Sequence, residues 1–422
     1  MNLAEDRAST HPAATPADPG RRRRRVGLSL RALMVVVLLL GGGIGWYAYR
    51  VRVQRQAVAA IEATGGHVVY EWTFGGRSFP PPTLSAWRKW LVDAVGPDFL
   101  QDVACVYLGD RTDDATMARV GRLRGLRRLD LRKTAVTDAG LAHLRHLTRL
   151  EDLSILAQPS VTDAGLVHLR GLVRLRSLDL TLIGMTGRAL RHLEGMTRLE
   201  SLSLAYLPLE DDDLAHLAGL IALESLCLSG ERLTDAGLAH LRKLTNLEAF
   251  ALVGHRSTGI TGAGIVHFGG MRRLESLGLS WSGVASLESI GGLTGLKTLV
   301  LDGTPLDDAD LAPVAGLRAL EMLSLNNARV GDAGLAHLGG LTRLKWLSLR
   351  QTRVTDAGLA GLFATPTRLD YLDLTGTGIT DAGLGPLAAR GGLGLLVLTG
   401  TKVTPAGVAA LKKAIPGVSI VP

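Results

Sequence analysis

The sequence predicts an α/β solenoid, a curved array of strand–helix repeats, with a transmembrane helix near its N-terminus. From Leu126 onward, the pattern L-x-x-L-x-L followed by T-D-A-G-L-x-x-L-x-x-L recurs about twelve times, mostly at 24-residue intervals. A fixed period of this length is typical of a solenoid, in which each copy buries its leucines against its neighbours. The copies begin at Leu126, Leu150, Leu175, Leu199, Leu223, Leu247, Leu274, Leu296, Leu320, Leu344, Leu369 and Leu393.

The net charge of +8 is concentrated before the repeats. Residues 1–55 contain ten arginines and three acidic residues, a net charge of +7, so the remaining chain carries about +1. No basic face is therefore expected for a nucleic-acid backbone. Residues 1–30 lack an apolar period and are predicted to be a disordered, basic, cytoplasmic tail.

Residues 31–50 are predicted to span a membrane. Within them Ala32–Tyr49 is uncharged and 18 residues long, at the short end of what crosses a bilayer. Six arginines lie just before the segment and three just after it, which favours a cytoplasmic N-terminus and extracytoplasmic repeats in the cell membrane. A cleaved signal peptide is the alternative, but the exit G-W-Y-A-Y-R-V-R offers no small-x-small cleavage site. Gly41 and Gly45 form a G-x-x-x-G pair that allows a weak dimer, unless the glycines are simply tolerated in the helix.

Residues 51–102 do not repeat and are predicted to cap the array. Gln54–Ala63 has a helical pattern, His67–Phe74 alternates like a strand, and Leu84–Val95 is again helical. A solenoid needs a terminal unit that seals its first repeat, and Trp72, Trp87 and Trp90 fit the small core of such a cap.

Residues 103–417 are predicted to form about thirteen copies, of which the first, Val103–Gly125, is degenerate. In the copy at Leu126, Leu129 and Leu131 should point inward from a strand, with charged residues such as Asp130 pointing outward. Thr137 is placed to cap a helix whose leucines recur every three residues. Strands joined through helices predict a parallel sheet on the concave face, roughly 60 Å long at ~4.8 Å per strand, and helices on the convex face. Residues 418–422 should add a capping strand.

These copies resemble leucine-rich repeats of the ribonuclease-inhibitor type, and their T-D-A-G-L-A-H-L segments are similar to those of bacterial single-pass membrane-anchored repeat proteins. The resemblance implies a leucine-rich-repeat solenoid with a concave binding sheet and no catalytic residues. Two copies depart from the pattern. The copy at Leu247 is 27 residues long, with extra residues in Val253–Ile260, and the next replaces T-D-A-G with V-A-S-L at Val284.

Three ladders of charged or titratable residues invite a metal or an ion-pair interpretation. One is a histidine ladder: His143, His168, His192, His216, His240, His267 and His337. One is an aspartate ladder: Asp138, Asp163, Asp212, Asp235, Asp308, Asp332, Asp356 and Asp381. One is an arginine ladder: Arg149, Arg174, Arg198, Arg273, Arg343 and Arg368. Metal chelation by the histidines and a calcium column of aspartates are alternatives, but surface histidines, carboxylates at helix N-termini and solvated arginines are favoured, so no metal is expected.

Catalytic motifs for metal, nucleophile or phosphate chemistry do not occur in the sequence, so neither an enzyme nor a cofactor is predicted. Cys105 and Cys227 belong to the first and sixth strands, roughly 24 Å apart at ~4.8 Å per strand, and cannot form a disulfide.

The concave face is predicted to be uneven. Its fourth to seventh copies present small neutral residues, namely Ser201, Ser203, Ala205, Ser225, Cys227, Ser229, Ala249, Ala251, Ser276, Gly278 and Ser280. The ninth to eleventh copies present a patch that is typical of binding hot spots, namely Met322, Trp346, Arg350, Tyr371 and Asp373. An aromatic column that merely covers neighbouring strands is the alternative. His255 and Arg256 in the inserted segment are a secondary candidate site.

The predicted function is recognition of a protein, or of a glycan, by a membrane-anchored extracytoplasmic module. The alternative is a structural or regulatory scaffold without a dedicated ligand pocket.

Overall fold

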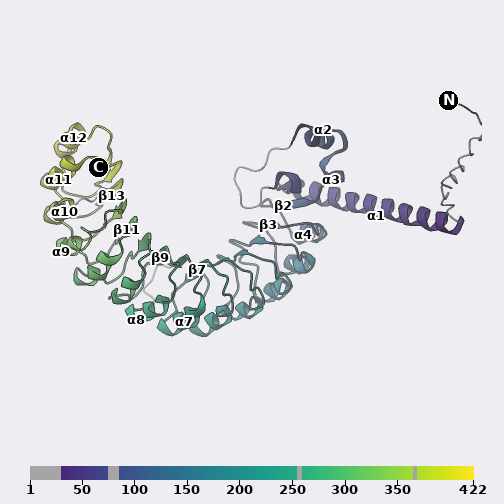
Figure 1. Ribbon diagram of the computed structural model, residues 1–422, viewed down its shortest axis with the longest axis horizontal. Helices are drawn as coiled ribbons and strands as arrows, with labels where there is room; N and C mark the ends of the chain where they lie inside the picture. Colours follow the sequence, from purple (N-terminus) through teal and green to yellow (C-terminus); the bar gives the residue numbers. More distant parts are fainter. Residues whose placement is uncertain (1–29, 75–84, 254–258, 365–367) are drawn as a thin grey trace, which may run out of the picture. The chain divides into compact units, whose positions relative to one another are not determined.

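The computed structural model describes residues 30–74, 85–253, 259–364 and 368–422. The chain divides into two compact units, Met1–Arg50 and Val51–Pro422. In the second unit fifteen strands form one sheet in which spatial order follows sequence order from β1 to β15. The strands line the inner side of a curve and the helices its outer side (Figure 1). The predicted leucine-rich-repeat solenoid is confirmed.

Helix α1 extends without a break over Leu30–Ala63, whereas the sequence predicted a span that ends at residue 50 and a separate helix from Gln54. The two fuse because no glycine or proline separates them. Side chains of the first unit, such as Leu39 and Ile44, are exposed. Among the described residues, α1 is the one helix whose length and apolar composition would allow it to cross a membrane.

The C-terminal end of α1 seals the first repeat. Ala57 and Ile61 are buried there with Met117 of α4 (Asp114–Val120). After the turn at Gly65, strand β1 (His67–Tyr70) pairs antiparallel with β2 (Val103–Tyr107) and covers that edge of the sheet. A 3-10 turn, η1 (Glu71–Thr73), ends β1 earlier than predicted, and α2 (Ala86–Val95) and α3 (Pro97–Leu100) follow.

The prediction that Trp72, Trp87 and Trp90 form the core of the cap is wrong. The exposed fractions of Trp87 and Trp90 on α2 are 61% and 68%, and Trp72 is half-buried. The apolar face of α1 fills this core instead, because a long helix that continues into the cap supplies more apolar surface than the short α2.

Strands β2 to β15 are all parallel, and from β3 onward neighbouring copies pair residue for residue. Their central leucines, such as Leu129 and Leu226, are buried as predicted. The remaining strands are β3 (Arg128–Asp130), β4 (Asp152–Ser154), β5 (Ser177–Asp179), β6 (Ser201–Leu204), β7 (Ser225–Ser229), β8 (Ala249–Val253), β9 (Ser276–Leu279), β10 (Thr298–Val300), β11 (Met322–Ser324), β12 (Trp346–Ser348), β13 (Tyr371–Asp373), β14 (Leu395–Val397) and β15 (Ser419–Val421).

The convex side consists of helical segments, as predicted, and most of them are short turns. A typical copy begins with one α-turn, as in α5 (Asp138–Leu141), and tightens into a 3-10 segment, η2 (Ala142–His146). Leucines at Leu141, Leu144 and Leu147 are three residues apart, which suits the 3.0 residues per turn of a 3-10 helix as well as an α-helix.

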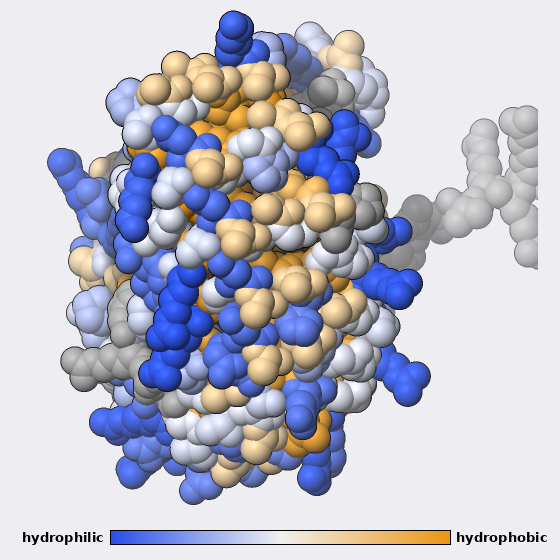
Figure 2. All heavy atoms as spheres, turned by 90° about the vertical axis from the view of Figure 1, so that its left-hand side faces the viewer, coloured by the Kyte–Doolittle hydropathy of each residue, from blue (hydrophilic) through white to orange (hydrophobic). Residues whose placement is uncertain are grey.

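The other helical segments are α6 (Asp163–Leu166), η3 (Val167–Leu169), η4 (Gly187–His192), η5 (Asp211–Leu217), α7 (Asp235–His240), η6 (Leu241–Lys243), α8 (Gly262–Ile265), η7 (Val266–Phe268), η8 (Glu288–Gly292), η9 (Ala309–Gly316), α9 (Asp332–Ala336), α10 (Asp356–Phe363), η10 (Asp381–Gly383), α11 (Leu384–Arg390) and α12 (Pro405–Ala414). Helices α9 to α12 face the viewer in Figure 2, where hydrophilic and hydrophobic side chains are interspersed.

The aspartate ladder joins consecutive repeats. In eight copies a carboxylate accepts two hydrogen bonds from the threonine of the next copy, one from its N–H at 2.7–2.9 Å and one from its hydroxyl at 2.5–2.7 Å. Asp308 accepts a hydrogen bond from the N–H of Gly331 at 2.6 Å instead. The pairs are Asp114–Thr137, Asp138–Thr162, Asp163–Thr186, Asp211–Thr234, Asp235–Thr261, Asp332–Thr355, Asp356–Thr380 and Asp381–Thr404. We call each pair an Asp–Thr bracket.

The brackets correct the sequence interpretation in two respects. The carboxylates bind the next copy in addition to lying at helix N-termini, and Asp211 rather than Asp212 occupies the ladder. The brackets also explain the glycine of T-D-A-G. A Cβ atom on Gly140 would lie 2.3 Å from Oδ1 of Asp114, and a Cβ atom on Gly165 would lie 2.3 Å from Oδ1 of Asp138. Only glycine leaves room for the carboxylate of the preceding copy.

Candidate binding surface

Met322, Trp346 and Tyr371 form one row across the concave face. They begin strands β11, β12 and β13 and are direct partners in the parallel register, as the sequence predicted. The rings of Trp346 and Tyr371 are stacked, with centroids 4.6 Å apart and planes inclined by 8°. This separation is close to the ~4.8 Å between neighbouring strands, so the sheet itself holds the two rings face to face. All three side chains are partly exposed.

Arg350 and Asp373 lie beside this row but differ in exposure. The carboxylate of Asp373 is buried, and its Oδ1 accepts hydrogen bonds from the N–H and the hydroxyl of Thr375 at 2.9 and 2.6 Å. Its Oδ2 accepts a hydrogen bond from the Tyr371 hydroxyl at 3.3 Å and lies 3.8 Å from Nε of the half-exposed Arg350. Asp373 therefore orients Tyr371 and Arg350 from below, and Arg350 is the charged group of the patch that faces solvent.

The environment of Tyr371 raises the pKa of its phenol. Burial is the main cause, and the negative charge and hydrogen bond of Asp373 add to it. The phenol consequently stays protonated and acts as a donor to Asp373.

A polar network beneath the patch was not predicted from the sequence. Asp302 accepts hydrogen bonds from the hydroxyl of Ser324 at 2.5 Å and from the N–H of Asn326 at 3.0 Å. Asn326 in turn accepts from the hydroxyl of Ser348 at 2.6 Å and from the N–H of Arg350 at 2.9 Å. The network ties three consecutive copies together along β10 to β12, so the patch has a rigid base.

This network corrects one detail of the predicted concave face. Asp373 was expected to be presented to a partner, but it is buried, as are Ser324 and Ser348 at the equivalent positions of β11 and β12. Asp130, at the equivalent position of β3, is buried as well, and Nε of Arg132 donates to its carboxylate. Polar side chains near the ends of these short strands turn toward their neighbours because buried polar groups need hydrogen-bond partners. The sequence signal was the polar column Asp302, Asn326, Arg350.

Among the small residues of the fourth to seventh copies, Ala205 and Ser229 are buried rather than presented to solvent. The first row lies where the sequence placed it. Ser201, Ser225, Ala249 and Ser276 follow one another in the register of β6 to β9. In the neighbouring row, Cys227 pairs with Ser203 and Ala251. Both cysteines of the chain are free, and burial raises the pKa of Cys105 to about 11.

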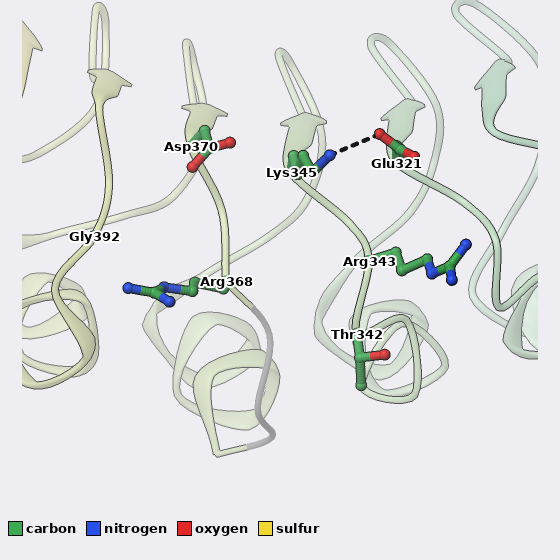
Figure 3. A pocket seen from close by; sticks show the side chains of 7 residues that line it. All are labelled: Glu321, Thr342, Arg343, Lys345, Arg368, Asp370 and Gly392. Carbon is green, nitrogen blue, oxygen red and sulfur yellow. Dashed lines mark hydrogen bonds and ion pairs between the residues drawn. The ribbon is translucent and has the colours of Figure 1, made fainter.

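A shallow hollow of about 460 Å³ lies where the chain enters strands β11 to β14 (Figure 3). Its lining residues are Glu321, Thr342, Arg343, Lys345, Arg368, Asp370 and Gly392. Nζ of Lys345 lies 2.8 Å from Oε2 of Glu321, and this hydrogen bond raises the pKa of the lysine and lowers that of the glutamate. Arg343 and Arg368 point away from each other in Figure 3, so they do not converge on one ligand. The hollow is a surface of alternating charges at the edge of the sheet.

In the arginine ladder at this edge, Arg273 forms an ion pair of the expected kind with Glu248. The histidine ladder is less uniform than predicted. His192 is buried rather than exposed, and its Nδ1 accepts a hydrogen bond from Nε of Arg170 at 2.8 Å. Burial and the nearby positive charge of Arg170 lower the pKa of His192. Within the described residues, no group of three or more histidine, cysteine or acidic side chains is placed to hold a metal.

The secondary candidates, His255 and Arg256, lie outside the described residues. Gly259, beyond this segment, forms an isolated parallel bridge with Thr234. Gly41 and Gly45 have open space around the position of a Cβ atom, which leaves the predicted dimer contact as an expectation.

Comparison with known proteins agrees with this architecture. A family model described as Leucine Rich repeat matches residues 367–388. A search of curated proteins found no match. Among solved structures, the chain is similar to an internalin (inlF) from Listeria monocytogenes, with 20% sequence identity and a TM-score of 0.61 over 79% of this chain and 92% of that chain.

A second similar structure is a chain of the yeast Rad7 and Elc1 complex, with 19% identity and a TM-score of 0.54 over 93% of this chain and 98% of that one. At these identities the likeness concerns the fold alone. The repeated sequence and the shared fold together support a leucine-rich-repeat architecture for this chain.

Proposed function

We propose that this protein recognises a protein partner through the concave patch formed by Met322, Trp346, Arg350 and Tyr371, with Asp373 as its buried support. The observation that carries the proposal is the row of three large, partly exposed side chains at the starts of β11 to β13, where the equivalent row of the middle copies has only serine and alanine. Aromatic and methionine side chains beside an arginine are enriched at the centres of protein interfaces.

Rigidity of the patch supports the same proposal. The stacked rings and the network from Asp302 to Arg350 fix the side chains before a partner arrives, so little conformational entropy is lost on binding. The polar network offers no convergent set of groups around a reacting atom, which favours recognition over catalysis. One of the similar structures, the yeast complex, contains a second protein, Elc1.

A scaffold without a specialised surface remains the competing function. It requires the stacked rings to serve only as a cover for neighbouring strands, in which case their removal should affect stability and leave binding unchanged.

Replacement of both Trp346 and Tyr371 by alanine should weaken binding of a captured partner by at least ~2 kcal/mol, about thirtyfold in Kd, because hot-spot aromatic residues contribute most of the affinity of an interface. The partner would first be isolated by cross-linking to the full-length protein, and Kd would then be measured with both variants folded. Trp281→Ala is the matched control, since Trp281 is a partly exposed tryptophan outside the patch.

An affinity that is unchanged in the double variant would refute the patch. If affinity falls instead when the segment between Val253 and Ile260 is shortened, the site belongs to the insertion that carries His255 and Arg256.

We further propose that residues 31–50 are an uncleaved anchor and that the repeats are extracytoplasmic. The support is the apolar composition of α1, together with the excess of arginines before the apolar run. Protease added to intact spheroplasts should then remove a C-terminal epitope tag, while a cytoplasmic marker protein stays intact. Complete protection of the tag would contradict this topology.

A further inference from the structure

Helix α2 presents an unusually apolar surface to solvent. None of its ten residues, all described, is buried, and Trp87 and Trp90 are the most exposed large apolar side chains described after residue 50. Leu91 and Val92 are half-buried and attach the helix to the cap. Exposed aromatic side chains of this size in a soluble domain usually mark a surface that another molecule covers.

Neighbouring groups hold one of the tryptophans in place. The rings of Trp72 and Trp87 lie 6.5 Å apart, and the guanidinium of Arg88 lies 5.2 Å from the centroid of the first and 5.4 Å from that of the second. Arg88 and Lys89 give the same helix a positive charge beside its aromatic rings, against the single acid Asp93. An aromatic and cationic surface is complementary to the interfacial region of a bilayer that contains anionic lipids.

The chain connects α2 closely to the apolar run of α1. Helix α3 follows α2 directly, and its Asp98 accepts a hydrogen bond from Gln54 at 3.1 Å. The guanidinium of Arg55 lies 4.5 Å from the ring centroid of Phe99. Arg55 follows Tyr49, the last residue of the uncharged run, by six positions in the sequence.

We infer that α2 lies on the lipid surface, with Trp87 and Trp90 inserted among the headgroups and Arg88 and Lys89 paired with anionic ones. The inference rests on the proposed anchor. It adds a second attachment to the bilayer within residues 85–100, formed by a surface helix rather than by a span. We favour a lipid surface over a protein partner because α2 is followed directly by α3, whose Phe99 contacts Arg55 of α1, six residues beyond the uncharged run.

The test uses the full-length chain in liposomes that contain anionic lipid, with Cys105→Ala and Cys227→Ser as the background. Single cysteines at Leu40, Trp90 and Val266 are labelled with a polarity-sensitive fluorophore, and quenching by lipids brominated on their acyl chains is measured. Val266 is the matched control, because it is an exposed apolar residue of the repeats with an exposed fraction of 59%, close to the 68% of Trp90.

We expect at least twofold stronger quenching at Trp90 than at Val266, and strong quenching at Leu40. Quenching at position 40 with none at position 90 would overturn the surface helix and leave the anchor intact. If the cysteine at position 90 is also protected from labelling, its face is covered by a protein or by a second copy of this chain. Absence of quenching at Leu40 would instead refute the anchor.

A probe at Val95 tests the same helix with both tryptophans retained. Its quenching should fall at least twofold in Trp87→Ser/Trp90→Ser and stay unchanged in Trp281→Ser, and equal quenching in all three proteins would overturn the role of the tryptophans.

Discussion

Replacing Leu226 by alanine is expected to destabilise the middle of the array by ~2–5 kcal/mol, since the change removes a fully buried side chain and leaves a cavity. Leu226 lies at the centre of β7, has an exposed fraction of 1%, and pairs in register with Leu202 and Phe250. Each copy of a solenoid contacts only its neighbours, so the loss should be local and should open the copies on either side.

Hydrogen exchange measured along the chain checks this expectation. Protection should fall in β6 to β8 and remain nearly unchanged in β2 and β14. Ser225→Ala is the control, because its side chain is only partly buried on the concave face and its removal should cost less than ~0.5 kcal/mol. A uniform loss of protection from one end of the array to the other would show that the solenoid unfolds as a single cooperative unit.

Gly358→Ala should destabilise the C-terminal copies by ~2–4 kcal/mol, through overpacking and the loss of hydrogen bonds. A Cβ atom at this position would lie 2.4 Å from Oδ1 and 3.0 Å from Cα of Asp332. Because one of these atoms belongs to the backbone, the carboxylate cannot simply rotate away, and the Asp–Thr bracket between Asp332 and Thr355 must open.

Helix α10 supplies its own control for this prediction. Gly361 has no atom within 4 Å of its Cβ position, so Gly361→Ala should be neutral or should stabilise the helix by up to ~1 kcal/mol. Urea denaturation of the two variants measures the difference. Asp332→Ala should lose both bracket bonds and resemble Gly358→Ala. Equal stability of Gly358→Ala and Gly361→Ala would mean that the bracket tolerates a methyl group and that the glycine of T-D-A-G has another role.

Much of the fold followed from the sequence because solenoid contacts repeat with the chain. Once the period of 24 residues was recognised, the strand at each L-x-x-L-x-L and the burial of residues such as Leu129 followed from alternation alone. The same register placed Met322, Trp346 and Tyr371 in one row, since parallel copies pair residue for residue. Whether that row binds a partner stays a prediction.

Side-chain choices at the ends of elements could not be derived in this way. An aspartate that follows a threonine is compatible with helix capping, and only the stacking of copies shows that its carboxylate reaches the threonine of the next one. Burial of Ser348 and Asp373 depends likewise on hydrogen bonds across neighbouring strands. Local patterns predict which face of the array a residue occupies. They do not predict its hydrogen-bond partners, which lie one repeat away in the sequence.

The cap shows most clearly what the sequence predicts and what only the tertiary structure decides. Apolar residues and tryptophans in residues 51–102 predicted a small aromatic core, and the sequence by itself determined the apolar run, the repeat period and the positions of the core leucines. Tertiary structure alone decided that α1 continues into the cap, that Ala57 and Ile61 fill its core, and that Trp90 is left exposed on α2. The physical reason is that the apolar faces of α1 and α2 compete for one small core beside the first repeat. Hydrophobicity along the chain does not specify which of the two faces is buried there.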